Sequence, residues 1–85
     1  MKIIKPTYKF VEYKGNRVPA PLNTRFLAVS AHGQPVGDAP YVLKAYQHRP
    51  EYDADNKSWC SEYGSIELAI VETDLPMEDT LVEIK

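Results

Sequence analysis

Turn residues interrupt this chain at short intervals, which limits it to short elements of structure. Seven prolines are spread over 85 residues, and each fixes φ and lacks a backbone donor. Between the turns lie runs of aromatic, β-branched and polar residues, a composition typical of strands. Apolar residues make up 44% of the chain, which is enough for a packed core and excludes disorder. We therefore expect a single mostly β domain over residues 1–85.

Four segments carry the strand pattern. Residues 14–17 (Lys-Gly-Asn-Arg) predict a turn between them, because Gly and Asn tolerate a positive φ, so the first segment becomes half of a hairpin. Pro19 and Pro21 exclude the next residues from a helix or a central strand. The predicted strands are residues 8–13, 25–30, 41–47 and 65–72, with a loop over residues 31–40 and a polar turn over residues 48–57.

Residues 65–72 show the clearest alternation. Ile66, Leu68 and Ile70 fall on one side and Glu67 on the other, which predicts one buried face and one wetter face, as in an antiparallel sheet. The same alternation predicts a shared face for Tyr41, Leu43 and Ala45.

The end of the chain fits two structures. Thr80, Val82 and Ile84 alternate as in a strand, whereas Met77, Leu81 and Ile84 fit one face of a short helix. The β-branched residues favour the strand. Trp59 is expected to anchor the core because of its large area. The predicted fold is a small antiparallel curved sheet or barrel of about four to five strands, with one short C-terminal helix as the alternative for the tail.

Charge is distributed unevenly along the chain. Residues 1–25 carry six basic side chains and one acidic side chain, whereas residues 51–85 carry ten acidic and two basic side chains. One interpretation is that the two ends pair across a sheet, where opposite charges attract. The other is an acidic face that binds a basic partner. The candidate protein-binding residues are Glu67, Glu72, Asp74, Arg49 and Tyr52, the last two because Arg and Tyr are common at interaction hot spots.

The basic beginning of the chain supports a different binding hypothesis. Basic residues interleaved with aromatic ones on a β surface can neutralise phosphates and stack bases. Against this, Tyr8 and Phe10 share one side of their strand and could simply face the core, and the chain's pI is about 5.6, whereas such domains are usually basic. The candidate nucleic-acid-binding residues are Lys5, Tyr8, Lys9, Lys14 and Arg17.

The sequence carries no phosphate-binding loop, dinucleotide fingerprint or nucleophile elbow. Cys60 with His32 or His48 as its base would be a nucleophilic pair, but a lone cysteine beside a tryptophan is expected to be a small buried residue. Residues 53–58 fail as a calcium loop because Lys and Ser replace required positions, so they are interpreted as a solvated turn. We therefore predict no enzymatic activity, no metal and no cofactor.

The location of the protein is inferred from two features. One cysteine in a chain this small indicates a reducing compartment, since small secreted domains usually carry several. The sequence contains no apolar run long enough to span a membrane and no signal-peptide pattern. We therefore expect the protein in the cytoplasm, without a membrane partner.

An ordered set of short motifs extends over residues 25–79. It consists of Arg25-Phe26-Leu27-Ala28-Val29-Ser30, Pro35 with Gly37, Tyr41-Val42-Leu43, Trp59 and Leu75-Pro76. This order resembles a small uncharacterised domain family common in phages and prophages, whose pattern opens with Arg-Trp-x-x-Val-Ser. Phe26 stands in place of the family's Trp, and Val71-Glu72-Thr73 in place of a later one. The resemblance implies a phage or mobile-element origin and assigns no catalytic residue.

These observations predict a non-enzymatic, phage-type accessory protein. It is expected to bind, and to inhibit or modulate, a host macromolecule, for example a nucleic-acid enzyme reached through the acidic half of the chain. The alternative is a nucleic-acid-binding β domain that uses the basic first strand. The sequence does not determine the oligomeric state.

Overall fold

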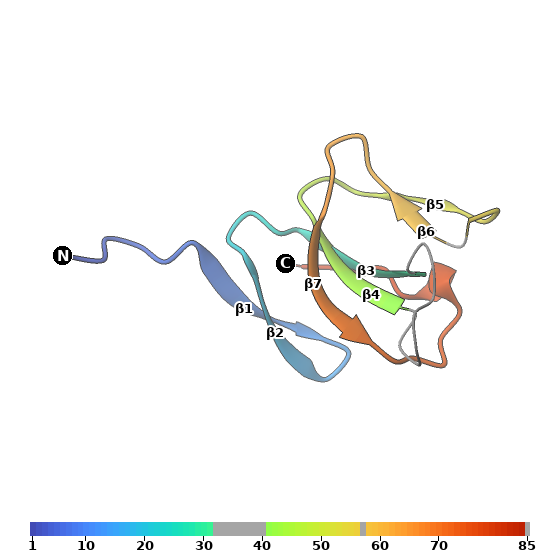
Figure 1. Ribbon diagram of the computed structural model, residues 1–85, viewed down its shortest axis with the longest axis horizontal. Helices are drawn as coiled ribbons and strands as arrows, with labels where there is room; N and C mark the ends of the chain where they lie inside the picture. Colours follow the sequence, from blue (N-terminus) through green and yellow to red (C-terminus); the bar gives the residue numbers. More distant parts are fainter. Residues whose placement is uncertain (32–40, 57, 85) are drawn as a thin grey trace.

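The strand-like segments fold into three antiparallel sheets (Figure 1). The structure is a computed structural model that describes residues 1–31, 41–56 and 58–84. The central sheet has the strand order β7-β4-β3-β8, and two hairpins, β1-β2 and β5-β6, accompany it. The elements are β1 (Tyr8–Tyr13), β2 (Asn16–Pro21), β3 (Phe26–Ala31), β4 (Tyr41–Tyr46), β5 (Glu51–Asp53), β6 (Ser58–Cys60), β7 (Ile66–Val71), the 3₁₀ helix η1 (Met77–Asp79) and β8 (Val82–Glu83).

The predicted mostly β, antiparallel class is confirmed, with more and shorter strands than expected. The described strands form separate sheets rather than the closed barrel that was one alternative. β5 lies within the predicted polar turn over residues 48–57 and pairs with β6. Ala31, the first residue of the predicted loop over residues 31–40, is instead the last residue of β3, and residues 32–40 lie outside the described part of the chain.

The first hairpin forms as predicted, but its turn is shorter than residues 14–17, because Asn16 and Arg17 already belong to β2. Lys14 and Gly15 have φ values of 48° and 85°, and Tyr13 pairs with Asn16 across them. Two consecutive positive φ values are characteristic of the type I′ turn, which matches the twist of the flanking strands. β2 accommodates Pro19 and Pro21 because each strand of a two-stranded sheet keeps one free edge, where a missing N–H costs no ladder bond.

One face of the central sheet forms the main core. Leu27 and Val29 of β3 lie opposite Ala45 and Leu43 of β4, as the predicted shared face of β4 requires. The first hairpin covers this face with Val11, Tyr13 and Ala20, and Met77 of η1 completes the cluster.

The opposite face of the sheet is also buried. Ala28, Ser30, Val42 and Tyr46 are each 2% exposed or less. The second hairpin reaches this face, because the backbone N–H of Trp59 donates to Ser30 Oγ (2.9 Å) and Tyr46 Oη donates to the Trp59 carbonyl (3.2 Å). Burial on both faces explains why β3 and β4 are almost continuously apolar.

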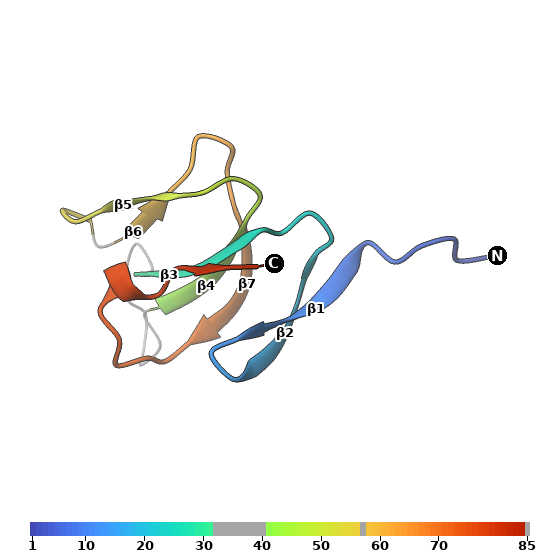
Figure 2. The same cartoon turned by 180° about the vertical axis from the view of Figure 1, so that it is seen from behind.

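Thr80 joins the separate sheets. Its buried Oγ1 accepts the backbone N–H of Val29 (3.0 Å) and the indole N–H of Trp59 (3.2 Å), and it donates to the Met77 carbonyl (2.7 Å). Its carbonyl accepts the hydroxyl of Tyr13 at 2.7 Å. One residue thus links the first hairpin, the central sheet and the second hairpin. Figure 2 shows this part of the chain passing along β3.

The prediction for residues 65–72 is wrong for two isoleucines. Leu68 packs against the core, but Ile66 and Ile70 are 53% and 59% exposed. A β-bulge explains Ile70: Leu43 pairs with Ala69 and the next residue of β4 pairs with Glu67, so Leu68 is the extra residue and Ile70 lies on the opposite face. A bulge breaks the two-residue period that the prediction assumed. Ile66 pairs with Ala45 on the core face but is the first residue of β7, where it stays exposed.

The tail combines both predicted structures. One turn of 3₁₀ helix, η1, is followed by the short strand β8, which pairs with Phe26 and Leu27. This one-turn helix is the only helix among the described residues, so none there has the length or apolar character to cross a membrane.

We predict that Thr80→Val lowers the free energy of unfolding by about 1–3 kcal/mol, since it leaves the buried N–H of Val29 without its acceptor, whereas the Trp59 indole N–H keeps its bond to the Met77 carbonyl at 2.9 Å. Thr80→Ser keeps the hydroxyl and loses only a methyl group, so it should be clearly less destabilising. Urea unfolding followed by the fluorescence of Trp59, the one tryptophan of the chain, measures both. Equal losses in the two variants would show that the methyl group matters rather than the hydrogen bonds.

We also predict a loss of stability at alkaline pH that depends on Tyr13. Burial raises the pKa of Tyr13, partly offset by its hydrogen bond to Thr80. The stabilisation is therefore complete below the unfolded value of about 10 and is lost as the pH rises through the folded pKa. Burial also raises the pKa of Tyr46, so Tyr13→Phe should weaken this dependence without abolishing it. The exposed Tyr8→Phe variant is the control, and urea midpoints across alkaline pH are the measurement. An unchanged slope in Tyr13→Phe would contradict the prediction.

Candidate binding surfaces

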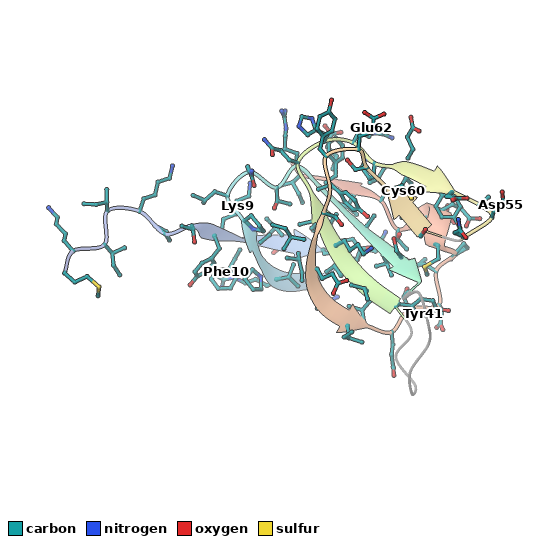
Figure 3. The ribbon with its side chains drawn as sticks, turned by 45° about the horizontal axis from the view of Figure 1, so that its top comes forward. Lys9, Phe10, Tyr41, Asp55, Cys60 and Glu62 are labelled. Atoms are coloured by element: carbon teal, nitrogen blue, oxygen red, sulfur yellow. The ribbon has the colours of Figure 1, made fainter. Side chains whose placement is uncertain are left out.

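The first hairpin has two different faces, and its outer face is exposed. Alternation along β1 directs Val11 and Tyr13 into the core and turns Tyr8 and Phe10 away from it. The side chains of Tyr8 and Phe10 are each 51% exposed. Figure 3 shows Lys9 and Phe10 on opposite sides of the strand. β1 therefore presents two aromatic rings to solvent.

The strand register extends this surface onto β2. Directly opposite residues of an antiparallel pair lie on the same face, so each outward residue of β1 has an outward neighbour on β2. The surface contains two aromatic rings, two prolines and one pair of opposite charges. We define this hairpin outer face as Tyr8, Phe10, Glu12, Arg17, Pro19 and Pro21.

The aromatic and basic side chains of this face are held against one another. The Tyr8 and Phe10 rings meet edge to face, with centroids 5.7 Å apart and planes at 86°. The Arg17 guanidinium carbon lies 4.3 Å from the Phe10 centroid, a favourable cation–π distance. Side chains that are already ordered lose less entropy when a partner binds, so the face is preorganised for contact.

Charge is segregated in space as well as in sequence. The hairpin lies to one side of the body, and residues 1–7 extend farther away from it (Figures 1 and 2). Residues 1–21 carry five basic side chains and one acidic, and residues 22–85 carry eleven acidic and five basic. The two ends do not pair as one sheet, since β1 pairs with β2 and β7 pairs with β4. The protein thus has a basic projection and an acidic body.

The five residues predicted to bind nucleic acid are divided among different places. Tyr8 and Arg17 lie on the hairpin outer face, and Lys5 lies in the extended segment before it. Lys9 is half-buried on the other side of β1, beside β8. Lys14 occupies the turn, with its ammonium 5.9 Å from the neighbouring tyrosine ring centroid. The structure therefore assembles only part of the predicted set.

The expectation that Tyr8 and Phe10 face the core is wrong. Both sides of β1 carry large apolar residues, so its alternation is consistent with either orientation. Val11 and Tyr13 take the core side, where the Tyr13 hydroxyl finds a buried acceptor in the Thr80 carbonyl. An aromatic residue with a polar end packs well where that end has a partner.

The candidate protein-binding residues also separate. Glu67 lies on β7, and Glu72 and Asp74 follow its end, all three exposed. The exposed Ile66 and Ile70 lie on the same strand. The predicted acidic residues thus lie near two exposed isoleucines, Ile66 and Ile70, that the sequence pattern had predicted to be buried.

Arg49 and Tyr52 lie away from that acidic group. Arg49 follows β4, with its guanidinium carbon 5.8 Å from the Phe26 centroid. Tyr52 of β5 is half-buried, with its ring centroid 5.2 Å from that of Trp59. Burial raises the pKa of Tyr52, and the Glu78 carboxylate raises it further. Tyr52 therefore serves packing more than contact with a partner.

A groove separates the tip of the first hairpin from the end of β7. Its volume is about 440 Å³, and its lining mixes apolar and polar residues, with Val18 on one side and Val71 and Leu75 on the other. Lys14 and Arg17 add two positive charges and Glu72 one negative charge. The groove can receive one apolar side chain of a partner that contacts the hairpin.

Cys60 is exposed, so the expectation of a buried cysteine is wrong. Its neighbour Trp59 takes the inward position on the short strand β6, and alternation turns Cys60 outward. Cys60 lines an open hollow of about 480 Å³ that includes Arg49 and Tyr63. His48 packs on Tyr63, with ring centroids 4.0 Å apart, and His32 lies outside the described residues. The absence of catalysis by Cys60 stays a prediction.

The segment after β5 forms the local turn that the sequence indicates. Asp53 Oδ1 accepts the backbone N–H groups of Asp55 (3.0 Å) and Asn56 (3.4 Å), and Oδ2 accepts the Asn56 amide at 2.7 Å. These bonds to Asn56 and Asp55 hold the pKa of Asp53 below its usual value. Within the described part of the chain, no three His, Cys, Asp or Glu side chains gather as metal ligands would.

Comparisons with protein-family models, with curated proteins and with solved structures found no match to this chain. The resemblance of residues 25–79 to a phage family therefore stays a prediction, and the functional argument depends on the geometry alone.

Sequence reasoning placed Tyr8 and Arg17 among nucleic-acid contacts and missed the surface they share. Pro19 and Pro21 belong to that surface but were interpreted only as strand breakers. The predicted turn over residues 14–17 would pair Phe10 with Pro21; the observed turn pairs Phe10 with Pro19, a shift of two residues that keeps the same side chains on one face. Either register would have shown the composition of the face, though not which face is exposed.

Proposed function

We propose that this protein is a non-enzymatic binding module that holds a partner protein on the hairpin outer face. The observation that supports this most directly is the exposed Tyr8–Phe10 pair with Arg17 stacked on Phe10. Tyr and Arg are the residue types that most often dominate binding energy at protein interfaces, and aromatic residues are enriched there.

The composition of the face favours a protein over a nucleic acid. Glu12 lies opposite Arg17 and places a negative charge where a phosphate would have to bind. Pro19 and Pro21 add rigid apolar area beside the rings. Apolar rings with a charge pair at the margin resemble the core and rim of a protein interface. The groove beyond the hairpin tip extends this contact surface toward β7.

Such a module acts by binding to a surface of its partner. By covering part of its partner it inhibits or modulates the partner without chemistry of its own. The resemblance to phage proteins supports a host protein as the target, such as a nucleic-acid enzyme, and the single cysteine supports a cytoplasmic setting.

We predict that replacing both Tyr8 and Phe10 by Ser abolishes capture of the partner from a lysate of the source cells. The partner, identified by mass spectrometry and then purified, should lose at least about 2 kcal/mol of binding free energy in titration calorimetry, as expected for hot-spot residues.

The control variant for this experiment is Tyr63→Ser. It removes an aromatic ring that is 71% exposed but lies on the body, away from the hairpin. Capture that survives the double substitution, or is lost equally in Tyr63→Ser, would contradict the hairpin outer face as the binding surface.

Direct binding of single-stranded nucleic acid is the second candidate, favoured by the same exposed rings beside Lys5 and Arg17. It predicts low-salt binding of labelled oligonucleotides whose logarithmic affinity falls with log salt by about 0.7 per phosphate neutralised. Arg17→Gln and Lys5→Gln should each reduce that slope, while Lys44→Gln on β4 should not. Fluorescence anisotropy measures all three, and an absence of binding at low salt would end this candidate.

A further inference from the structure

Residues 1–7 combine apolar and basic side chains without packing on the body. Ile3 and Ile4 are 75% and 83% exposed, and Lys2 and Lys5 flank them. Figures 1 and 2 show this segment extended away from the three sheets. Two adjacent isoleucines in water lose the stabilisation that burial would give them, so the segment has the character of an arm that docks elsewhere.

The surface of β7 has the complementary pattern. The bulge brings Glu67 and Ile70 opposite Lys44 and Val42, so they lie only two positions apart on one face. Glu72 follows two residues after Ile70 and is also exposed. On this face β7 presents the Glu67 carboxylate and Ile70, and Glu72, which also borders the groove at the hairpin tip, adds a second carboxylate just past the end of the strand. The unbulged strand would have turned Glu67 and Ile70 to opposite faces.

The two patterns agree in length. At about 3.3 Å per extended residue, Lys2 and Lys5 are about 10 Å apart. Glu67 and Glu72 are about 13 Å apart along the face of β7 by the same measure. In an extended arm Lys2 and Ile4 share one side, so Ile4 lies above Ile70 with Lys2 at one carboxylate. Lys5 starts from the other side, and its long flexible side chain reaches around the arm to the second carboxylate.

We infer that the arm of one copy, residues 2–5, docks on Glu67, Ile70 and Glu72 of a second copy. The arm of the same chain leads away from its own body, so the contact is between molecules. β2 contacts β7, and the arm docks through its side chains rather than as an added strand. This contact joins two different surfaces, so it builds rings or open chains unless two copies exchange arms.

Sedimentation velocity over a range of concentrations tests this inference on the full chain. Self-association should weaken as salt rises. Lys2→Glu with Lys5→Glu, and separately Glu67→Lys with Glu72→Lys, should each lower the association constant at least about tenfold. An equimolar mixture of the two charge-reversed proteins should associate again, because each arm then meets a surface of opposite charge.

Two controls make the result specific. Ile70→Ser should weaken association with the charges intact, whereas Tyr8→Ser with Phe10→Ser should leave it unchanged, which keeps this contact separate from the hairpin outer face. Circular dichroism confirms that each variant is folded. A full chain that stays monomeric at every concentration, charge-reversed proteins that do not associate when mixed, or association that depends on Tyr8 and Phe10 would each overturn the inference.

Discussion

The hydrogen bonds of Thr80 are the interaction on which the rest of the structure depends. The three sheets share no continuous backbone ladder, so side chains must hold them together. The Thr80 hydroxyl accepts hydrogen bonds from the Val29 N–H of β3 and from the Trp59 indole N–H, and the Thr80 carbonyl accepts one from the Tyr13 hydroxyl. Bonds this deeply buried are costly to lose, because the freed groups cannot reach water. The orientation of the first hairpin, and hence its exposed face, follows from this junction.

That arrangement also explains where binding surface remains. The first hairpin covers one face of the central sheet and the second hairpin contacts the other, so β3 and the middle of β4 offer little to a partner. Exposed apolar residues are left on the outside of β1, on β7 and in residues 1–7. In a chain this small, the elements that complete the core must carry the contact surfaces on their opposite sides.

Local structure was predictable and side-chain orientation was less so. The Lys14-Gly15 turn, the first hairpin and the Asp53 turn follow from residues close in sequence, and each is confirmed. The predicted burial of Ile70 was wrong because one extra residue at Leu68 shifts the two-residue period, and that of Ile66 was wrong because it lies at the exposed start of β7. Of the hairpin outer face, the sequence named Tyr8 and Arg17, while Pro19, Pro21 and the exposure of Phe10 were missed.

The sequence by itself determined the β class, the antiparallel pairing of neighbours and the contrast between a basic beginning and an acidic remainder. These depend on turn chemistry, two-residue alternation and composition, which are local properties. Only the tertiary structure decided which side of β1 meets solvent, that Cys60 is exposed and that β7 carries isoleucine between carboxylates. Each of these depends on what packs against a strand, and the packing partners, such as Tyr13 and Thr80, lie 67 residues apart.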